Sequence, residues 1–187
     1  MSNNPVEQEV HNLVKNIDYS LRLNGAKFVL LASDRMGEGK STFLVNCLPV
    51  LSKIYQRQVL IYDCQSDEEL TGIAPLQGND QFIKKTKYPG VDYIHQDDLS
   101  FLNTANPEDK VSVANSHFLE ISKDYDVVFI NMKTMSKFNK TKIPGLPIDG
   151  AIIMRSRKSI NESIKPITNE LQDREIPILG LVWNEGT

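Results

Sequence analysis

The sequence predicts an α/β fold with a mostly parallel central sheet and helices on both of its faces. Segments that are apolar throughout alternate with helix-like segments, which is the pattern of a parallel sheet buried on both sides. A glycine-rich loop that ends in lysine follows the first apolar segment and precedes a helix-like stretch. The length of 187 residues fits one domain, 1–187, with a substantial core.

The first part of the chain predicts helix, strand and helix. A helix is expected over residues 5–22, and Asn24 and Gly25 follow it as a stop signal. An apolar strand is expected over 27–32 and a second helix over 41–55, where Pro49 would introduce a kink. The first helix carries apolar residues at helical spacing on one face, namely Val10, Leu13, Val14, Ile17 and Leu21.

The middle of the chain predicts two more strands and a helix. A strand over 59–62 precedes a polar segment, 64–90, for which we expect a loop with a short helix near 80–86. A short strand is expected over 91–94. Residues 107–122 are expected to form a helix, because proline and two acidic residues occupy its first turn.

The last part of the chain returns to strands. Residues 126–131 form an apolar run that ends in a polar residue, and a basic loop, 132–148, follows it. A strand over 150–154, a helix over 159–172 and a final strand over 178–183 complete the expected order.

Composition limits the classes of partner. The chain is 40% hydrophobic and 24% charged with a net charge of −3, which is typical of soluble globular proteins. This mild acidity provides no electrostatic footprint for nucleic acid, so no nucleic-acid partner is expected. Cys47 and Cys64 lack metal-ligand spacing and are expected to be reduced core thiols. Because no signal peptide or membrane-spanning run is recognisable, we expect a cytoplasmic protein that reaches a membrane only through a partner.

The glycine-rich loop, 33–42, reads SDRMGEGKST and predicts a phosphate-binding P-loop. Glycines let backbone N–H groups turn toward a phosphate, the helix N-terminus adds partial positive charge, and Lys40 reaches the outer phosphates. Ser41 would supply a hydroxyl for Mg²⁺. The usual GxxxxGK[ST] spacing requires glycine at position 34, where this chain has Asp34. The sequence therefore predicts a P-loop NTPase fold with a deviant loop.

Other polar residues follow the ends of apolar strands. Asp63, Asn131 and Asn184 all take such positions. In parallel α/β sheets, ligands bind beyond the carboxyl ends of the strands. These residues are therefore expected near the P-loop.

With these residues, the chain resembles the bacterial tyrosine kinases (BY-kinases) and the related ATPases that accompany polysaccharide chain-length determinants. The loop of that family typically reads SxxPGEGKST, and here Met36 takes the place of its proline. The resemblance implies that ATP or ADP binds, with Lys40 and Asp63 as catalytic residues and Ser41 and Asp63 as Mg²⁺ ligands. It implies these nucleotide-binding residues: Arg35, Gly37, Glu38, Gly39, Lys40, Ser41, Thr42 and Asn184.

The resemblance covers most of the chain. Glu9, Asn12 and Lys15 occupy the place of the family's ExxRxxR helix, which mediates ring assembly. The segment KDYDVVFI, from residue 123, resembles the family's "YD-apolar" strand. DGA, from residue 149, matches the opening of the next strand, and GLVWN, which ends at residue 184, matches the closing one. Because two arginines of the assembly helix are replaced, the resemblance leaves a homo-oligomer or a hetero-oligomer open.

The departures from the family concern its carboxylates. The acidic motif DxDxR reads DCQSD here, so Asp63 is present and the second aspartate is Gln65. The Walker B strand, which should end in aspartate, ends in Asn131, and an amide cannot supply the charge that helps to hold Mg²⁺. We expect a rate loss on the order of 10²-fold or more for each lost carboxylate. Neighbouring acids are the alternative source of charge, namely Asp34, Asp67 and Glu68.

Autophosphorylation is not expected. Autokinases of this family carry a tyrosine-rich C-terminal tail, whereas the last tyrosine here is Tyr125. A tail absent from the sequence given would change this expectation.

Two features leave alternatives open. Arg35 aligns with the lysine that crosses the dimer interface in partition and cell-division ATPases, so it either acts in trans on phosphate or is a solvated loop residue. The basic loop, 132–148, either contacts an anionic partner or is a solvated charge run.

Three functions follow, in order of preference. The first is a nucleotide-binding, catalytically weakened BY-kinase-like protein, a weak ATPase at most. It would act in bacterial exopolysaccharide synthesis or export and bind a membrane chain-length determinant or another export protein. The second is an active ATPase switch of the cell-division and partition type. The third is a tyrosine kinase with unusual metal ligands.

Overall fold

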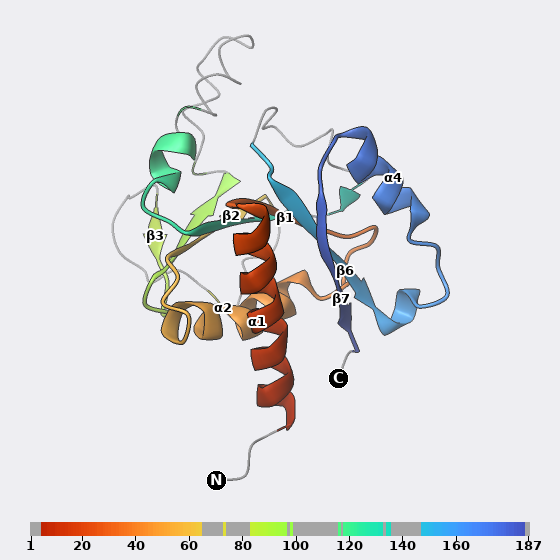
Figure 1. Cartoon of the computed structure of the whole chain (residues 1–187), viewed down its shortest axis with the longest axis horizontal. Helices are drawn as coiled ribbons and strands as arrows, with labels where there is room; N and C mark the ends of the chain where they lie inside the picture. Colours follow the sequence, from red (N-terminus) through yellow and green to blue (C-terminus); the bar gives the residue numbers. More distant parts are fainter. Residues whose placement is uncertain are drawn as a thin grey trace.

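A computed structural model describes residues 5–64, 73, 83–96, 98, 116, 118–132, 134–135 and 147–185. Its centre is a seven-stranded sheet with the order β3-β4-β2-β5-β1-β6-β7 (Figure 1). The strands are β1 Phe28–Ala32, β2 Val59–Asp63, β3 Lys84–Lys85, β4 Val91–His95, β5 Val127–Asn131, β6 Gly150–Ser156 and β7 Ile178–Asn184. The helices are α1 Pro5–Asn24, α2 Lys40–Lys53 and α4 Lys165–Asp173, with a short 3₁₀ helix, η3, over Arg157–Ser159.

The sheet is parallel apart from its edge strand β3. Neighbouring strands among β1, β2, β4, β5, β6 and β7 pair in the parallel sense, and β3 pairs with β4 in the antiparallel sense. In β1, β2, β5 and β6, every residue is buried. This explains why these strands read as unbroken apolar runs, as expected for strands covered on both faces. The predicted mostly parallel α/β fold is confirmed.

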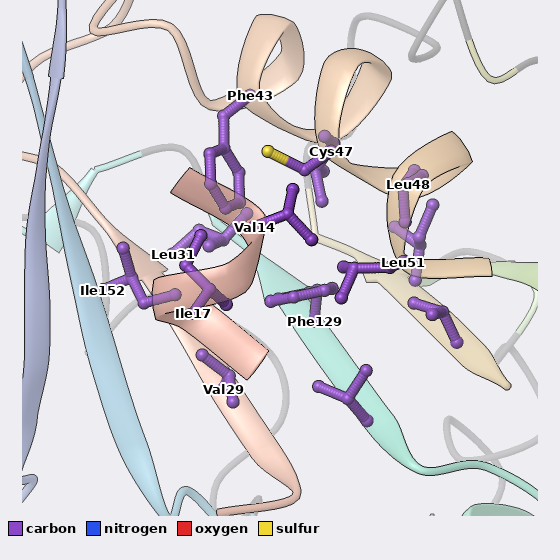
Figure 2. Packing of buried hydrophobic residues seen from close by; sticks show 14 of the residues in the cluster. Val14, Ile17, Val29, Leu31, Phe43, Cys47, Leu48, Leu51, Phe129 and Ile152 are labelled. Atoms are coloured by element: carbon purple, nitrogen blue, oxygen red, sulfur yellow. The ribbon is translucent and has the colours of Figure 1, made fainter. Parts of the chain in front are cut away.

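Helices cover both faces of the sheet. On one face, α1 and α2 pack side by side, and Val14 and Ile17 of α1 meet Phe43 and Cys47 of α2 over the strands (Figure 2). On the other face, the apolar side of α4 packs against Ala151 and Ile153 of β6, together with Phe118. α4 contributes Ile167 and Leu171 to this second core. The sheet is therefore the middle layer of three.

Two aspartates tie the starts of neighbouring strands together. The Asp149 carboxylate, just before β6, accepts hydrogen bonds of 2.8 Å from the backbone N–H groups of Lys27 and Phe28 at the start of β1. The Asp126 carboxylate, just before β5, accepts a 2.7 Å hydrogen bond from the N–H of Gln58 at the start of β2. Both aspartates belong to segments that resemble the BY-kinase family. Their contacts are structural ones, at the strand ends opposite the P-loop.

A buried ionic cluster fixes α1 to the sheet. Asp18 is 2% exposed, and its carboxylate lies 3.0 Å from Arg22 and 2.8 Å from Arg57, which precedes β2. A buried carboxylate is tolerated only when it is paired in this way. On the outer surface of α1, Glu9, Asn12 and Lys15 are exposed.

Two predicted helices differ from the structure. Within 80–86, residues 84–85 form strand β3, which pairs with β4 after a turn that contains Gly90 at a φ of +76°. The helix expected over 159–172 begins only at Lys165, because residues 156–162 instead contact Arg155 and the P-loop. Most of the helix expected over 107–122 and most of the loop 132–148 lie outside the described residues.

Both cysteines are buried and free, as predicted. Burial raises the pKa of the Cys47 thiol to about 12 and also raises the pKa of Cys64, so both remain protonated. Among the described helices, none combines the length and the apolar character needed to cross a bilayer.

We predict that Leu48→Ala lowers the free energy of unfolding by about 2–5 kcal/mol, because Leu48 is fully buried between α2 and the sheet. Leu23→Ala is the matched control, since Leu23 is 69% exposed, and its expected effect is within about 0.5 kcal/mol. Urea denaturation of both variants measures the difference. Equal losses would contradict the packing described for α2.

Candidate nucleotide-binding site

The P-loop turns on two glycines in the left-handed conformation. Gly37 has a φ of +79° and Gly39 a φ of +92°, and α2 begins directly after Gly39. No side chain caps the start of α2. The N–H groups of its first turn therefore have no partner within the helix, and the helix dipole adds partial positive charge there. This arrangement suits an anion such as a phosphate.

Asn184, at the end of β7, lies directly against the loop. A Cβ atom added to Gly39 would lie 2.0 Å from Asn184 Nδ2, so only glycine allows this approach. Ser41 and Thr42, in the first turn of α2, are exposed, and Thr42 lines the same groove as Asn184. The sequence prediction that Asn184 lies beside the P-loop is consistent with this geometry.

Lys40 is buried at the base of the loop, with 6% of its surface exposed. Its ammonium group donates a short hydrogen bond to Ser33 Oγ, at the end of β1. Burial lowers the pKa of Lys40 to about 8, although the nearby carboxylates of Glu38 and Asp63 oppose this shift. A phosphate bound in the loop would add negative charge that favours the ammonium form.

Asp63 and Asn131 face each other across the ends of β2 and β5, where they form a register pair. Asn131 Nδ2 donates a 3.1 Å hydrogen bond to one oxygen of Asp63, and Tyr93 Oη donates a 3.0 Å bond to the other. Both Asp63 and Asn131 are fully buried. Asn131 Oδ1 has no hydrogen-bond partner within the described part of the chain.

These residues fit a tightly held Mg²⁺ ion poorly. A hard cation prefers several charged oxygen ligands, whereas here one carboxylate already accepts two hydrogen bonds and its neighbour is a neutral amide. Within the described residues, no group of three or more His, Cys, Asp or Glu side chains could hold a metal. Asp63 and Ser41 remain the candidate metal ligands. Gln65, Asp67 and Glu68 lie outside the described residues.

Two charged side chains of the P-loop, those of Arg35 and Glu38, contact residues at the end of β6 or just after it. The Glu38 carboxylate is buried, and it accepts hydrogen bonds from Ser156 N and, at 3.0 Å, from Ser159 Oγ. Arg35 is 63% exposed at its side chain and forms a 2.7 Å ion pair with Glu162. Of these two predicted nucleotide-binding residues, Glu38 therefore has its carboxylate turned to η3 and Arg35 has a carboxylate partner in the same chain.

Arg155 is a buried residue of this region that sequence reasoning missed. It is 1% exposed, and its guanidinium forms a 3.0 Å ion pair with Asp34 of the P-loop. Burial raises the pKa of Asp34, and Arg155 opposes this effect. The signal was present in the sequence, because an arginine directly follows the apolar run of β6. Sequence reasoning missed Tyr93 as well, since a tyrosine in a buried strand is expected to be an ordinary core residue.

A groove runs from the P-loop between α1, α2 and β7. Its volume is about 660 Å³, within the range of small-molecule sites. Gly39, Thr42 and Asn184 line the end beside the loop, and the remainder is lined by apolar side chains together with Glu9, Asn46 and Glu185. Those apolar residues include Val6, Val10, Leu13, Phe43, Leu181 and Val182.

Comparisons with known proteins reveal similarity at the level of the fold. No protein-family model and no curated protein matches the chain. Among solved structures, the BceF tyrosine kinase domain is similar with a TM-score of 0.68 and 14% identity, over 95% of this chain and 76% of that one. The VpsO kinase domain has a TM-score of 0.56 and 17% identity, over 97% and 96% of the two chains.

Other similar structures were solved with bound nucleotides. Cobyrinic acid a,c-diamide synthase from Mycobacterium smegmatis, solved with ADP and magnesium, has a TM-score of 0.59 and 13% identity, over 84% of this chain and 74% of that one. A putative plasmid partition protein from Borrelia burgdorferi, bound to AMPPNP, has a TM-score of 0.54 and 16% identity, over 87% and 77%. The predicted resemblance to BY-kinase domains and the P-loop NTPase fold are confirmed.

We predict that Gly39→Ala destabilises the protein more than Gly37→Ala. Both residues have positive φ, which costs an alanine about 1–2 kcal/mol. Only the Cβ at residue 39 would also collide with Asn184, since nothing lies within 4 Å of a Cβ at residue 37. Urea denaturation of both variants tests this order, and equal losses would contradict the contact with Asn184.

The lowered pKa of Lys40 predicts how the stability of the protein depends on pH. Its pKa of about 8 in the folded state lies below the ordinary value of 10.5, so between these values the unfolded chain holds a proton that the folded one has lost. Stability should therefore rise with pH in this window. Relative to Lys40→Met, the wild type should gain on the order of 1 kcal/mol between pH 7.5 and 9.5, measured by urea denaturation. A constant difference between the two proteins would contradict the lowered pKa.

Proposed function

We propose that this protein binds ATP or ADP and is a catalytically weakened, BY-kinase-like protein. The observation that carries the proposal is the P-loop geometry, in which two left-handed glycines and the uncapped start of α2 lie beside Lys40. Backbone N–H groups supply most of the contacts to phosphate in such a loop, and they do not depend on acidic residues. Nucleotide binding can therefore persist where metal ligands have been replaced.

The groove beside the loop suits the nucleoside. It begins at Gly39 and Thr42 and continues between α1 and β7. Asn184 lies at the junction of loop and groove, where its amide can both donate and accept hydrogen bonds. The phosphates would occupy the loop, and the base would lie on the side of Asn184.

Weak catalysis follows from the environment of Asp63. Phosphoryl transfer requires metal-neutralised phosphates and an oriented nucleophile. Here Asp63 accepts hydrogen bonds from Tyr93 and Asn131, and Asn131 adds no charge. A Mg²⁺ ion that arrives with the nucleotide would find Ser41 and Asp63 as ligands, and it would supply the charge that stabilises the transferred phosphoryl group. We infer at most a weak ATPase activity.

The biological role rests on the resemblance of the motifs to the BY-kinase family, supported by the fold. We propose that the protein acts in the cytoplasm in bacterial exopolysaccharide biosynthesis or export. Its partner would be a membrane chain-length determinant or a polysaccharide export protein, which would bring it to the inner face of the membrane. Assembly would be with copies of itself or with such a partner, and not with nucleic acid.

The experiment is a calorimetric titration with ATP and ADP, with and without Mg²⁺, while phosphate release is followed in the same samples. Binding that is lost in Lys40→Ala, with negligible turnover, supports the proposal. Rapid Mg²⁺-dependent turnover would contradict the weakened catalysis and favour an active ATPase or kinase. An absence of binding to either nucleotide would overturn nucleotide binding itself.

We predict that Asn131→Asp restores dependence on metal. A carboxylate at this position adds the missing negative charge beside Asp63, so the affinity for ATP should become Mg²⁺-dependent and phosphate release should rise on the order of tenfold or more. The same change should lower stability, because two buried carboxylates would face each other.

Asn24→Asp is the matched control, because Asn24 is exposed at the far end of α1. It should change neither affinity nor turnover. Unaltered metal dependence in Asn131→Asp would contradict the role given to Asn131.

A further inference from the structure

The P-loop is attached to one particular segment of the chain, residues 155–162. Three charged P-loop residues, Asp34, Arg35 and Glu38, contact this segment through their side chains. They flank the peptide units around Gly37 and Gly39 whose N–H groups would face a phosphate. The conformation of the loop therefore depends on where this segment lies.

Arg155 is the centre of that attachment. Its Nη1 meets the Asp34 carboxylate at 3.0 Å, and its Nη2 donates to the backbone carbonyls of Ser159 at 2.6 Å and Glu162 at 2.9 Å. One buried guanidinium thus joins the P-loop to the last residue of η3 and to the turn that follows it. Leaving such a charge unpaired in the core would be costly, so each of its partners is constrained.

The attachment explains the unusual residue at position 34. Where the common P-loop spacing has glycine, this chain has an aspartate whose carboxylate is only partly exposed and faces Arg155. Arg35 and Glu38 strengthen the same junction through Glu162 and Ser159. The charges at positions 34, 35 and 38 of the loop therefore have partners within the chain before any nucleotide is present.

We propose that Arg155 is a positioning residue, which holds the P-loop in its phosphate-binding conformation through Asp34. Arg155 would affect the nucleotide only through the loop, so the expected effect on affinity rests on the nucleotide binding proposed above. The expected effect on the conformation of the loop does not rest on nucleotide binding. When Arg155 loses its guanidinium, Asp34 is left without its cation and residues 156–162 lose the donor that joins Ser159 to Glu162. Loop and segment should then loosen together.

The test uses Arg155→Met, Asp34→Asn and the double variant, with ADP affinity measured by calorimetry. Arg155→Met should weaken binding on the order of tenfold or more, since a small displacement of binding groups has effects of this size. Because Arg155 and Asp34 act through one shared ion pair, the double variant should bind no more weakly than Arg155→Met alone. Additive losses would overturn the proposal, as would an unchanged affinity in Arg155→Met.

Arg57→Met is the matched control. Like Arg155, Arg57 forms an ion pair with an aspartate, but it is only partly buried, its partner is Asp18, and it lies near the strand starts. Its loss should lower stability and leave ADP affinity unchanged. If Arg155→Met does not fold, Asp34→Asn alone decides the proposal, because it leaves the guanidinium and its carbonyl contacts in place.

Amide hydrogen exchange without nucleotide separates the two proposals. In Arg155→Met or Asp34→Asn, the amides of residues 35–40 and of residues 156–162 should both exchange faster than in the wild type, while those of β2 should not. Unchanged exchange in the loop would overturn the positioning role whether or not nucleotide binds. If the wild type binds no ADP while the variants exchange faster than the wild type, only the proposed function is overturned.

Discussion

The parallel register of β2, β5, β1 and β6 is the constraint on which the candidate site depends. These strands are buried on both faces, so a slip of one residue would move every side chain into the wrong core. The same register sets Asp63 opposite Asn131 and brings the end of β1, where the P-loop starts, between them and β6. Burial of the apolar strand residues thus fixes the positions of the polar groups at the strand ends, although these groups add nothing to the hydrophobic stabilisation.

Polar residues with structural contacts lie at one end of the sheet, and the candidate nucleotide-binding residues lie at the other. At the strand starts, Asp126 and Asp149 accept hydrogen bonds from the backbone of neighbouring strands. At the strand ends, Asp63 and Asn184 lie beside the loop. Part of the resemblance to the BY-kinase family therefore reflects how such a sheet is held together. The remainder lies in the candidate site.

The local hydrophobic pattern predicted the elements well where burial is uniform. It failed where contacts between distant parts of the chain determine the structure. The runs of β1, β2 and β5 were recognisable because each residue is apolar and buried. The start of α4 was misplaced, since the contacts of Ser159 and Glu162 with Arg155 replace helical hydrogen bonds there. The P-loop and the position of Asn184 followed from spacing. The partners of the charged P-loop residues could not be predicted in this way, because they lie about 120 residues away in the sequence.

The buried amide at the end of β5 also has an evolutionary consequence. Asparagine and aspartate codons differ by a single base, so the charge missing beside Asp63 is one mutation away. Yet that mutation would place two carboxylates face to face in the core, where the present amide donates a hydrogen bond to its neighbour. Under the weakened catalysis proposed above, selection for a stable fold and selection for turnover would act in opposite directions on this one residue. A lineage that needs only an occupied loop, and not a hydrolysed nucleotide, would keep the asparagine.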